Sequence, residues 1–209
     1  MNDALKKKSY YAIFWSFIER FSHQILQFFF SVFLARILLP EQFGLIAMTN
    51  IFVVIGNSFI NAGFGHALIQ KRNVTKTDES SIFFFNIFIA FLVSGIFYIS
   101  ANFISEFYNE PELFQIIKVL SLTLIFNSFG LVQRTLLSKN LDFKTQLKVS
   151  IFTSLISGTF AIYLALNEYG VWSLVFLLVS TDFFNSFFLW IFCKWRPVFI
   201  FSLNSLKSM

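Results

Sequence analysis

The sequence predicts an all-α membrane protein whose chain crosses the bilayer six times. Of its 209 residues, 56% are hydrophobic and 13% are charged, whereas a soluble domain carries about 25% charged residues. Apolar stretches of about 20 residues, the length that spans a hydrocarbon core, alternate with short polar segments. These two observations place the chain in the polytopic membrane class.

The apolar stretches define the expected transmembrane helices, which are residues 10–37, 43–68, 81–105, 113–135, 148–167 and 170–193. Helix-breaking or strongly polar sequence separates each of them from the next, such as Pro40, the run at 71–80 and Pro111. The first stretch is too long for the apolar part of a signal peptide and carries charges inside it. We therefore expect it to remain in the protein as a helix.

The distribution of lysine and arginine predicts the orientation in the membrane, because cytoplasmic connections are enriched in these residues. On alternate connections of a six-span topology, 13 of the 16 basic residues fall on one side: Lys6, Lys7, Lys8, Lys71, Arg72, Lys76, Arg134, Lys139, Lys144, Lys148, Lys194, Arg196 and Lys207. The opposite side carries acidic residues, among them Glu41 and Glu110. We expect both termini in the cytoplasm.

The first stretch differs from an ordinary transmembrane helix because it has a polar face. On a helix, seven of its residues fall within an arc of roughly 140°: Ser16, Glu19, Arg20, His23, Gln24, Gln27 and Ser31. Ionisable groups persist in a membrane helix only where they face partners, water or a cavity. We interpret this face as one wall of a transport path, and the alternative is that the same residues bond to one another and fix helix packing.

Two other stretches carry polar side chains for which packing is the simpler interpretation. Asn50, Asn57 and Asn61 share one face of the second stretch and suit amide bonds between helices. The fifth stretch has a row of small residues that allows a neighbouring helix to approach closely: Ser150, Ser154, Ser157, Gly158, Ala161 and Ala165.

Asp182 lies near the middle of the sixth stretch, with Asn185 and Ser186 one turn further along. A carboxylate at this depth marks a candidate functional site, and the alternative is a neutral aspartic acid bonded to a neighbouring helix. We expect Arg134, at the end of the fourth stretch, to extend its side chain to the membrane interface.

The sequence contains none of the short motifs of soluble catalysis. There is no glycine-rich phosphate loop, no G-x-S-x-G and no H-E-x-x-H, and His23 and His66 lie on different stretches. The net charge of +5 lies in loops between apolar stretches, which argues against nucleic acid as a partner. We expect no enzyme activity, no metal and no cofactor.

Short strings in the connections, in this order and spacing, resemble a known family: LARILLPEQFGLIAM (34–48), GFGHALIQKR (63–72), FYNEPEL (107–113), VLSL (119–122), QRTLLSKNLDFK (133–144), LISG (155–158), YGVWSLV (169–175) and KWRP (194–197). The chain resembles the bacterial polysaccharide or O-antigen repeat-unit flippases, the Wzx-like branch of the multidrug/oligosaccharidyl-lipid/polysaccharide exporter superfamily. The similarity runs from about residue 5 to about residue 203.

The resemblance implies a function in the biosynthesis of surface polysaccharide, such as lipopolysaccharide or exopolysaccharide. Such flippases move an undecaprenyl-diphosphate-linked oligosaccharide across the plasma membrane by alternating access between two six-helix lobes, coupled to a proton or sodium gradient. From position on the polar face and from chemistry alone, we expect Arg20 to bind the anionic diphosphate, with Glu19 and His23 as its partners or as proton carriers. Gln24, Gln27 and Asp182 complete the expected pathway for substrate or ion.

The resemblance also implies a second lobe, because members of the family are roughly twice as long. We divide the chain into one six-helix lobe, 1–197, and a segment, 198–209, that is a cytoplasmic tail or the beginning of a second lobe. The chain is then a truncated or half-length form that pairs with a separate lobe or with itself. The alternatives are an exporter of organic cations, a membrane-embedded enzyme and a non-transporting remnant.

Overall fold

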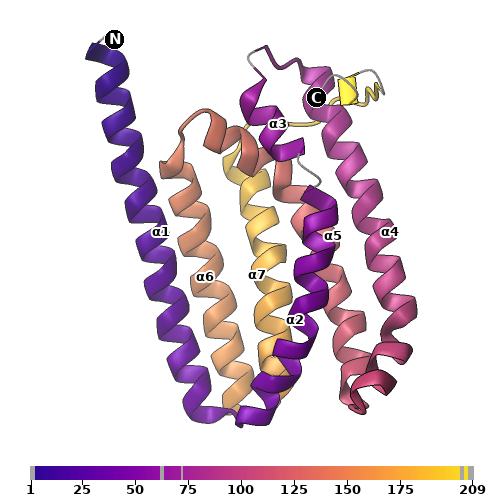
Figure 1. Cartoon of the computed structure of the whole chain (residues 1–209). Coiled ribbons are helices and arrows are strands. Elements are labelled where there is room, and N and C mark those ends of the chain that lie inside the picture. Colours follow the sequence, from indigo (N-terminus) through magenta and orange to yellow (C-terminus); the bar gives the residue numbers. More distant parts are fainter. Residues whose placement is uncertain (1–2, 62–63, 72, 203–204, 207–209) are drawn as a thin grey trace.

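The computed structural model describes residues 3–61, 64–71, 73–202 and 205–206, and these form an all-helical bundle (Figure 1). Its helices are α1 (Asp3–Ile37), α2 (Pro40–Asn61), α3 (Phe64–Gln70), α4 (Lys76–Tyr108), α5 (Glu112–Lys139), α6 (Phe143–Leu166) and α7 (Val171–Phe192). All six predicted stretches fall on these helices. The second one, 43–68, covers both α2 and the short α3, and its residues 62–63 lie outside the described part.

Local sequence explains where several helices begin and end. Thr75 caps α4 together with Asp78: the Asp78 N–H donates to the Thr75 hydroxyl, and the Thr75 N–H donates to the Asp78 carboxylate. Asp142 accepts the N–H of Thr145 at the start of α6. Gly170, with φ of +53°, forms the tight connection before α7.

Five helices, α2, α4, α5, α6 and α7, are long and apolar enough to cross a membrane. The described helix α1 is not among them, although it is 35 residues long. The reason is the polar face in its middle, which includes Glu19, Arg20 and His23 and lowers its mean hydropathy. Five of the six predicted membrane spans are therefore supported. The sixth, α1, stays a prediction.

The helices lie side by side, and α5 and α7 link α1 and α6 to α2 and α4. Helix α1 packs against α6, α6 against α7, α7 against α5, and α5 against α4, while α2 contacts α4, α5 and α7. The start of α1, the short α3, the start of α4, the α5–α6 connection and the C-terminal segment lie at one end of the bundle (Figure 1). The basic segments therefore share one end, which we call the basic end, as the predicted alternation of connections requires.

At the basic end, a segment after α7 crosses the beginning of α4. The backbone N–H of Val198 donates to the Ser80 hydroxyl at 2.9 Å, and that of Ser202 donates to the Ser81 hydroxyl at 3.0 Å. Leu206 is buried in an apolar cluster with residues of α3, α4 and α5. The described residues of 198–209 therefore pack against the bundle.

The small residues of α6 provide the close packing expected from the sequence. All six are buried, and α1 crosses them. At Gly158, an added methyl group would collide with the ring of Phe30, which is itself buried. The approach of α1 to α6 at this level therefore depends on a residue without a side chain.

Replacing Gly158 with alanine should lower the stability of the protein by about 1–3 kcal/mol, the usual cost of overpacking. A thermal unfolding transition in detergent measures the change. Gly95→Ala is the matched control, because a methyl group there meets nothing within 4 Å and alanine favours the helix.

The same substitution in a Phe30→Leu background should cost less than in the wild-type background, because leucine leaves space for the methyl group. Equal losses in the two backgrounds would show that the Phe30 contact does not limit the approach of α1.

Candidate functional site

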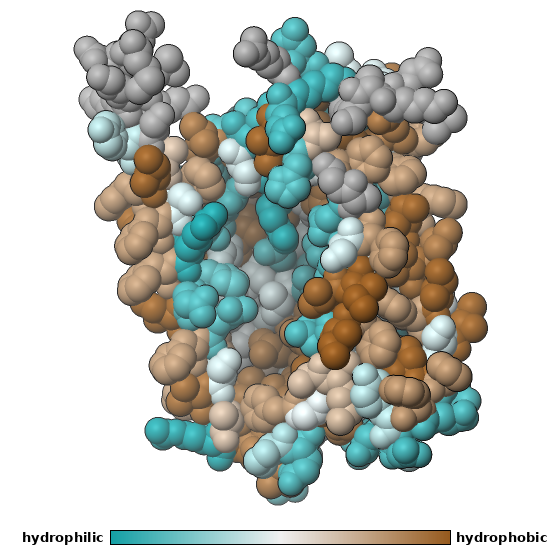
Figure 2. Space-filling model, in the orientation of Figure 1, coloured by the Kyte–Doolittle hydropathy of each residue, from teal (hydrophilic) through white to brown (hydrophobic). Residues whose placement is uncertain are grey.

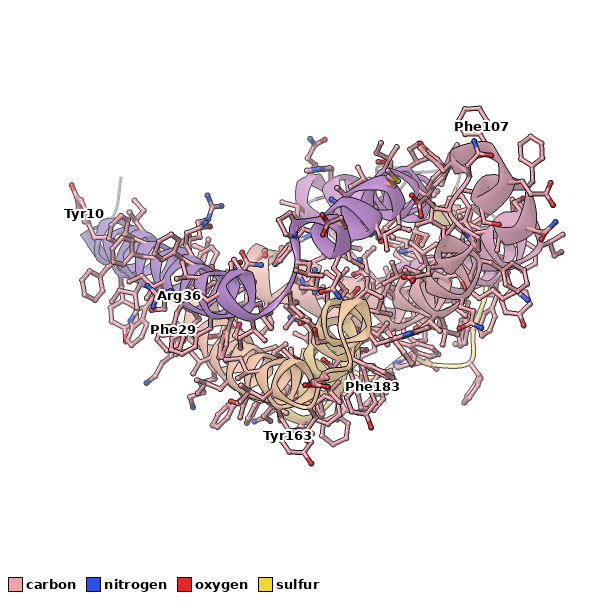
Figure 3. All side chains as sticks on the ribbon, turned by 90° about the horizontal axis from the view of Figure 1, so that it is seen from below. Tyr10, Phe29, Arg36, Phe107, Tyr163 and Phe183 are labelled. Atoms are coloured by element: carbon pink, nitrogen blue, oxygen red, sulfur yellow. The ribbon has the colours of Figure 1, made fainter. Side chains whose placement is uncertain are left out.

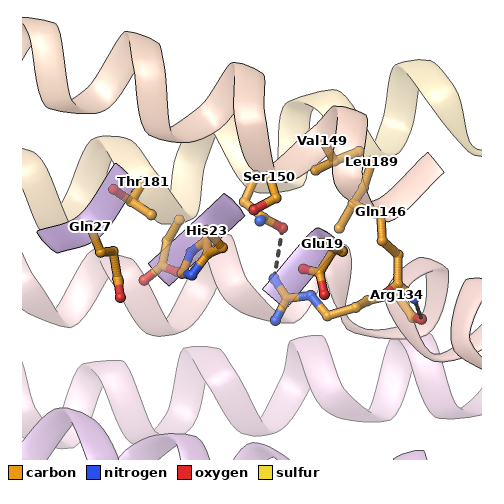
Figure 4. A pocket seen from close by; sticks show the side chains of 11 residues that line it. Glu19, His23, Gln27, Arg134, Gln146, Val149, Ser150, Thr181 and Leu189 are labelled. Atoms are coloured by element: carbon orange, nitrogen blue, oxygen red, sulfur yellow. Dashed lines mark hydrogen bonds between the residues drawn. The ribbon is translucent and has the colours of Figure 1, made fainter. Parts of the chain in front are cut away.

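A polar cavity of about 370 Å³ lies inside the bundle between α1, α5, α6 and α7 (Figure 4). The residues around it come from four helices, and most of them are polar or charged: Glu19, His23, Gln27, Arg134, Gln146, Val149, Ser150, Thr181, Asp182, Asn185 and Leu189. A second cavity of about 350 Å³ shares His23, Gln27, Thr181 and Asp182 with the first. The two cavities adjoin at these four residues, and together we call them the polar cleft.

Helix α1 contributes three of its polar residues to the cleft at regular spacing. Glu19, His23 and Gln27 are four residues apart, and residues at this spacing lie above one another on one face of a helix. The structure therefore brings half of the six pathway residues named from the sequence to one wall. Asp182, on α7, faces the same space from the opposite wall.

Arg134 enters the cleft from α5, where the sequence predicted a side chain reaching for the membrane interface. Its Nη2 donates a hydrogen bond of 2.7 Å to Oδ1 of Asn185 on α7, and it lies within electrostatic range of Asp182 and Glu19. Figure 4 shows the Arg134 side chain extending beside that of Glu19. The bond to Asn185 gives Arg134 a partner on a neighbouring helix that the sequence analysis did not name.

The charges of the cleft are mixed. The lining includes one guanidinium, two carboxylates and a histidine one turn from Glu19. Ser150 is 6% exposed, and its hydroxyl has no hydrogen-bond partner among the described residues. This set can bind a ligand with anionic and hydroxyl groups, because the guanidinium offers several N–H donors and the carboxylates, amides and hydroxyls accept or donate hydrogen bonds.

Two of the predicted pathway residues lie elsewhere. Gln24 is exposed and lines neither cavity of the cleft. Arg20 is exposed and lines a separate groove at the basic end, with Ala12, Ile13, Ser16, Phe17, Leu141 and Phe143. The seven polar residues do lie within an arc of roughly 140° on α1. That arc is wider than the part of α1 that faces the cleft.

The cleft is open on the side between α1 and α2. Figure 2 shows hydrophilic side chains along a hollow there, with apolar side chains on both flanks. The view along the bundle in Figure 3 shows α1 and α2 on either side of the hollow, with α6 and α7 behind it. On the α2 side, Nδ2 of Asn127 donates to Oδ1 of Asn57 at 2.8 Å, so the amide bond between helices that the sequence predicted is confirmed for Asn57.

Within the described ranges, no three His, Cys, Asp or Glu side chains are grouped as a metal site requires.

A sequence profile of the family described as polysaccharide biosynthesis protein matches residues 33–209. The chain belongs to this family. The resemblance to polysaccharide and O-antigen flippases is thus confirmed. The family profile begins at residue 33 and so does not include the polar face of α1.

Three curated relatives of this polysaccharide biosynthesis family are similar to the chain. The teichuronic acid biosynthesis protein TuaB of Bacillus subtilis is 28% identical over 74% of this chain and 32% of its own length. The succinoglycan biosynthesis transport protein ExoT of Rhizobium meliloti is 26% identical over 93% of this chain and 40% of its own. The lipopolysaccharide biosynthesis protein WzxC of Escherichia coli is 26% identical over 53% and 22%.

The matched part of the chain thus spans less than half the length of these relatives. No solved structure matches the chain.

If the polar cleft holds water, cysteines that line it should react with a hydrophilic, membrane-impermeant maleimide. We expect Gln27→Cys and Thr181→Cys, each in a Cys193→Ser background, to be labelled in inverted membrane vesicles. The matched controls Phe28→Cys and Phe183→Cys replace exposed side chains outside the cleft residues and should stay unlabelled, because a thiol in hydrocarbon does not ionise. Equal labelling of all four positions would show that the cleft is no more hydrated than the lipid-facing surface.

Proposed function

We propose that this chain forms one lobe of a flippase that moves a lipid-linked oligosaccharide repeat unit across the plasma membrane during synthesis of a surface polysaccharide. The observation that carries the proposal is the polar cleft inside a bundle of apolar helices. Family membership supports it, because the relatives are named as polysaccharide biosynthesis and transport proteins. The role is transport rather than catalysis.

The chemistry of the cleft suits the polar head of such a lipid. Each charged side chain within a membrane helix costs about 2.5–3.5 kcal/mol on insertion scales. The charged side chains of the cleft therefore lower the stability of the protein unless they face one another or water. Arg134 offers a guanidinium to the anionic diphosphate. Gln27, Asn185 and Ser150 offer the hydrogen bonds that sugar hydroxyls require.

The mixed charge of the cleft distinguishes this proposal from export of small organic cations. A site for cations would present carboxylates without a competing guanidinium. Here Arg134 lies within electrostatic range of both Asp182 and Glu19 and offsets one of their two negative charges. The cleft therefore offers an anionic group a cationic contact at Arg134, which a purely acidic site for cations would lack.

In this proposal α1 is a sixth membrane span, and its polar face is turned into the protein. Both termini lie in the cytoplasm, because the basic end carries most of the lysine and arginine. The labelling experiment extends to this orientation: a cysteine at Lys144 should react in inverted vesicles but not in intact cells. Labelling of Lys144→Cys from outside intact cells would contradict the orientation.

The opening of the cleft between α1 and α2 requires a second wall. We propose that a second helical lobe supplies it, whether in the same polypeptide, in a separate chain or in another copy of this one. Alternating access then moves the two lobes against each other around the cleft. Glu19, His23 and Asp182 are the groups that can couple this motion to a proton or sodium gradient.

Replacing Arg134 with alanine in a two-lobe protein that contains this lobe should lower export of lipid-linked oligosaccharide at least tenfold, because the anionic head loses its main cation. Arg134→Lys should retain part of the activity. Complementation of a flippase-null strain, with the protein level followed by immunoblot, measures the effect.

Lys118→Ala is the control for this experiment. Lys118 is also a cation within the helices, but it lies over the rings of Tyr98 and Phe114, away from the cleft. Export that stays normal in Arg134→Ala after correction for protein level would contradict a role of the cleft in binding the head group.

A further inference from the structure

The chain that follows α7 carries an apolar surface that the bundle does not cover. Residues 194–202, which we call the strap, lie beside the beginning of α4, on the opposite side of the bundle from α1 (Figure 1). Four consecutive side chains of the strap are exposed: Val198 by 39%, Phe199 by 95%, Ile200 by 49% and Phe201 by 52%. A contiguous row of large apolar side chains marks a surface that another apolar phase covers.

Three consecutive residues of α4, Glu79, Ser80 and Ser81, each accept a hydrogen bond from the strap. The donors are the indole N–H of Trp195 and the backbone N–H groups of residues 198 and 202. These backbone donors therefore have partners within the protein and need no water. The strap can lie at the edge of hydrocarbon, where unpaired backbone groups would be costly.

The exposed surface of the strap continues the outer surface of α4. The rings of Phe199 and Phe84 stack with their centroids 5.9 Å apart. Phe84 shares a helix face with Phe88 and Phe91, which are 64% and 54% exposed. Because α4 is long and apolar enough to cross a membrane, this face meets lipid, and Phe199 adds one more ring to it at the basic end.

The length of α4 gives the depth of the strap in a bilayer. Glu79 and Glu106 are 27 residues apart with no charged residue between them, or about 40 Å along the helix axis. A bilayer is about 40–45 Å thick with its head groups and about 30 Å without them. When α4 is centred, Glu79 lies among the head groups and Phe84 at the edge of the hydrocarbon. Trp195 then lies at the interface, where tryptophan is enriched.

Basic side chains border the apolar part of the strap. Lys194 and Arg196 precede it and Lys76 begins α4, and all three are exposed. The two acidic residues beside them, Asp78 and Glu79, each have a partner within the protein. An apolar surface bordered by cations fits a membrane surface that contains anionic phospholipid, because its head groups attract lysine and arginine.

We propose that the strap is a membrane-surface anchor: its apolar side chains enter the bilayer beside α4, and its basic side chains contact anionic phospholipid in the same leaflet. The opening of the polar cleft lies between α1 and α2, so a second lobe that covers the opening leaves the strap to lipid. The anchor ties the basic end of α7 to α4 and to one depth in the membrane. This inference does not depend on the transported substrate.

Quenching by lipid-borne nitroxide tests the proposal. The full chain, with Cys193→Ser and Phe199→Cys carrying an NBD fluorophore, is reconstituted in vesicles of phosphatidylcholine and phosphatidylglycerol. A nitroxide near the top of the lipid chain should quench the fluorophore at least threefold more than it quenches the same label at Asn73→Cys. Asn73 is the control because it is exposed in the connection before α4. Equal quenching at the two positions would overturn the anchor.

The two serine hydroxyls of α4 provide a second test. Ser80→Ala with Ser81→Ala leaves two backbone N–H groups of the strap without partners, so the strap should move toward water and quenching at position 199 should fall at least twofold. Ser100→Ala, on the same helix and far from the strap, is the control, and a melting transition checks that each variant folds. Unchanged quenching in the folded double variant would overturn the role of α4 in setting the depth.

The lipid partner is tested by charge and by crosslinking. Lys194→Gln should reduce any excess of quenching by nitroxide-labelled phosphatidylglycerol over labelled phosphatidylcholine, whereas Lys148→Gln, an exposed position on α6, should not. Equal effects of the two changes would overturn the anionic contact of the strap. A photoreactive residue at Phe201 should crosslink to phospholipid, and crosslinking to a second copy or to another lobe instead would overturn the membrane as partner.

Discussion

The cost of placing polar groups in hydrocarbon determines how this bundle is arranged. Helix α1 carries Glu19 and His23 between apolar residues, and a membrane helix tolerates such groups only against partners, water or a cavity. Helices α5 and α7 supply Arg134 and Asp182 to the same space. The mutual placement of these three helices, more than their apolar surfaces, gives the bundle its particular arrangement, because apolar helices gain little by packing on an apolar neighbour rather than on lipid.

The two halves of the α1–α6 contact differ, and the difference bears on transport. Away from the basic end, Leu34 and Leu38 pack into a buried cluster with Ala161, Ala165 and Leu174, and Phe30 closes on Gly158. Toward the basic end, Glu19 and His23 of α1 and Gln146 and Ser150 of α6 line the polar cleft. In the proposed function, this cleft forms part of the access path.

The sequence predicted the helices more fully than the site. The apolar stretches and the small residues of α6 are strong signals, because span length and close packing depend on local composition. The site depends on which arc of α1 faces its neighbours, and periodicity alone could not separate Glu19, His23 and Gln27 from Arg20 and Gln24. The Asn185 partner of Arg134 was missed for a related reason: a basic residue near a helix end usually reaches the interface, and this bond joins residues 51 positions apart. The polar residues on its own helix face, such as Asn127 and Ser128, were the available signal that this face of α5 meets other helices.

In the proposed function, the polar head of the lipid passes along the α1 wall of the cleft. A photoreactive amino acid at Gln27, in a two-lobe protein within cells that make lipid-linked oligosaccharide, tests this most directly. The account predicts a crosslink to lipid-linked oligosaccharide from Gln27 and none from Phe28, the next residue, which is 69% exposed and outside the cleft. Equal crosslinking from both positions, or crosslinking to phospholipid alone, would contradict the account.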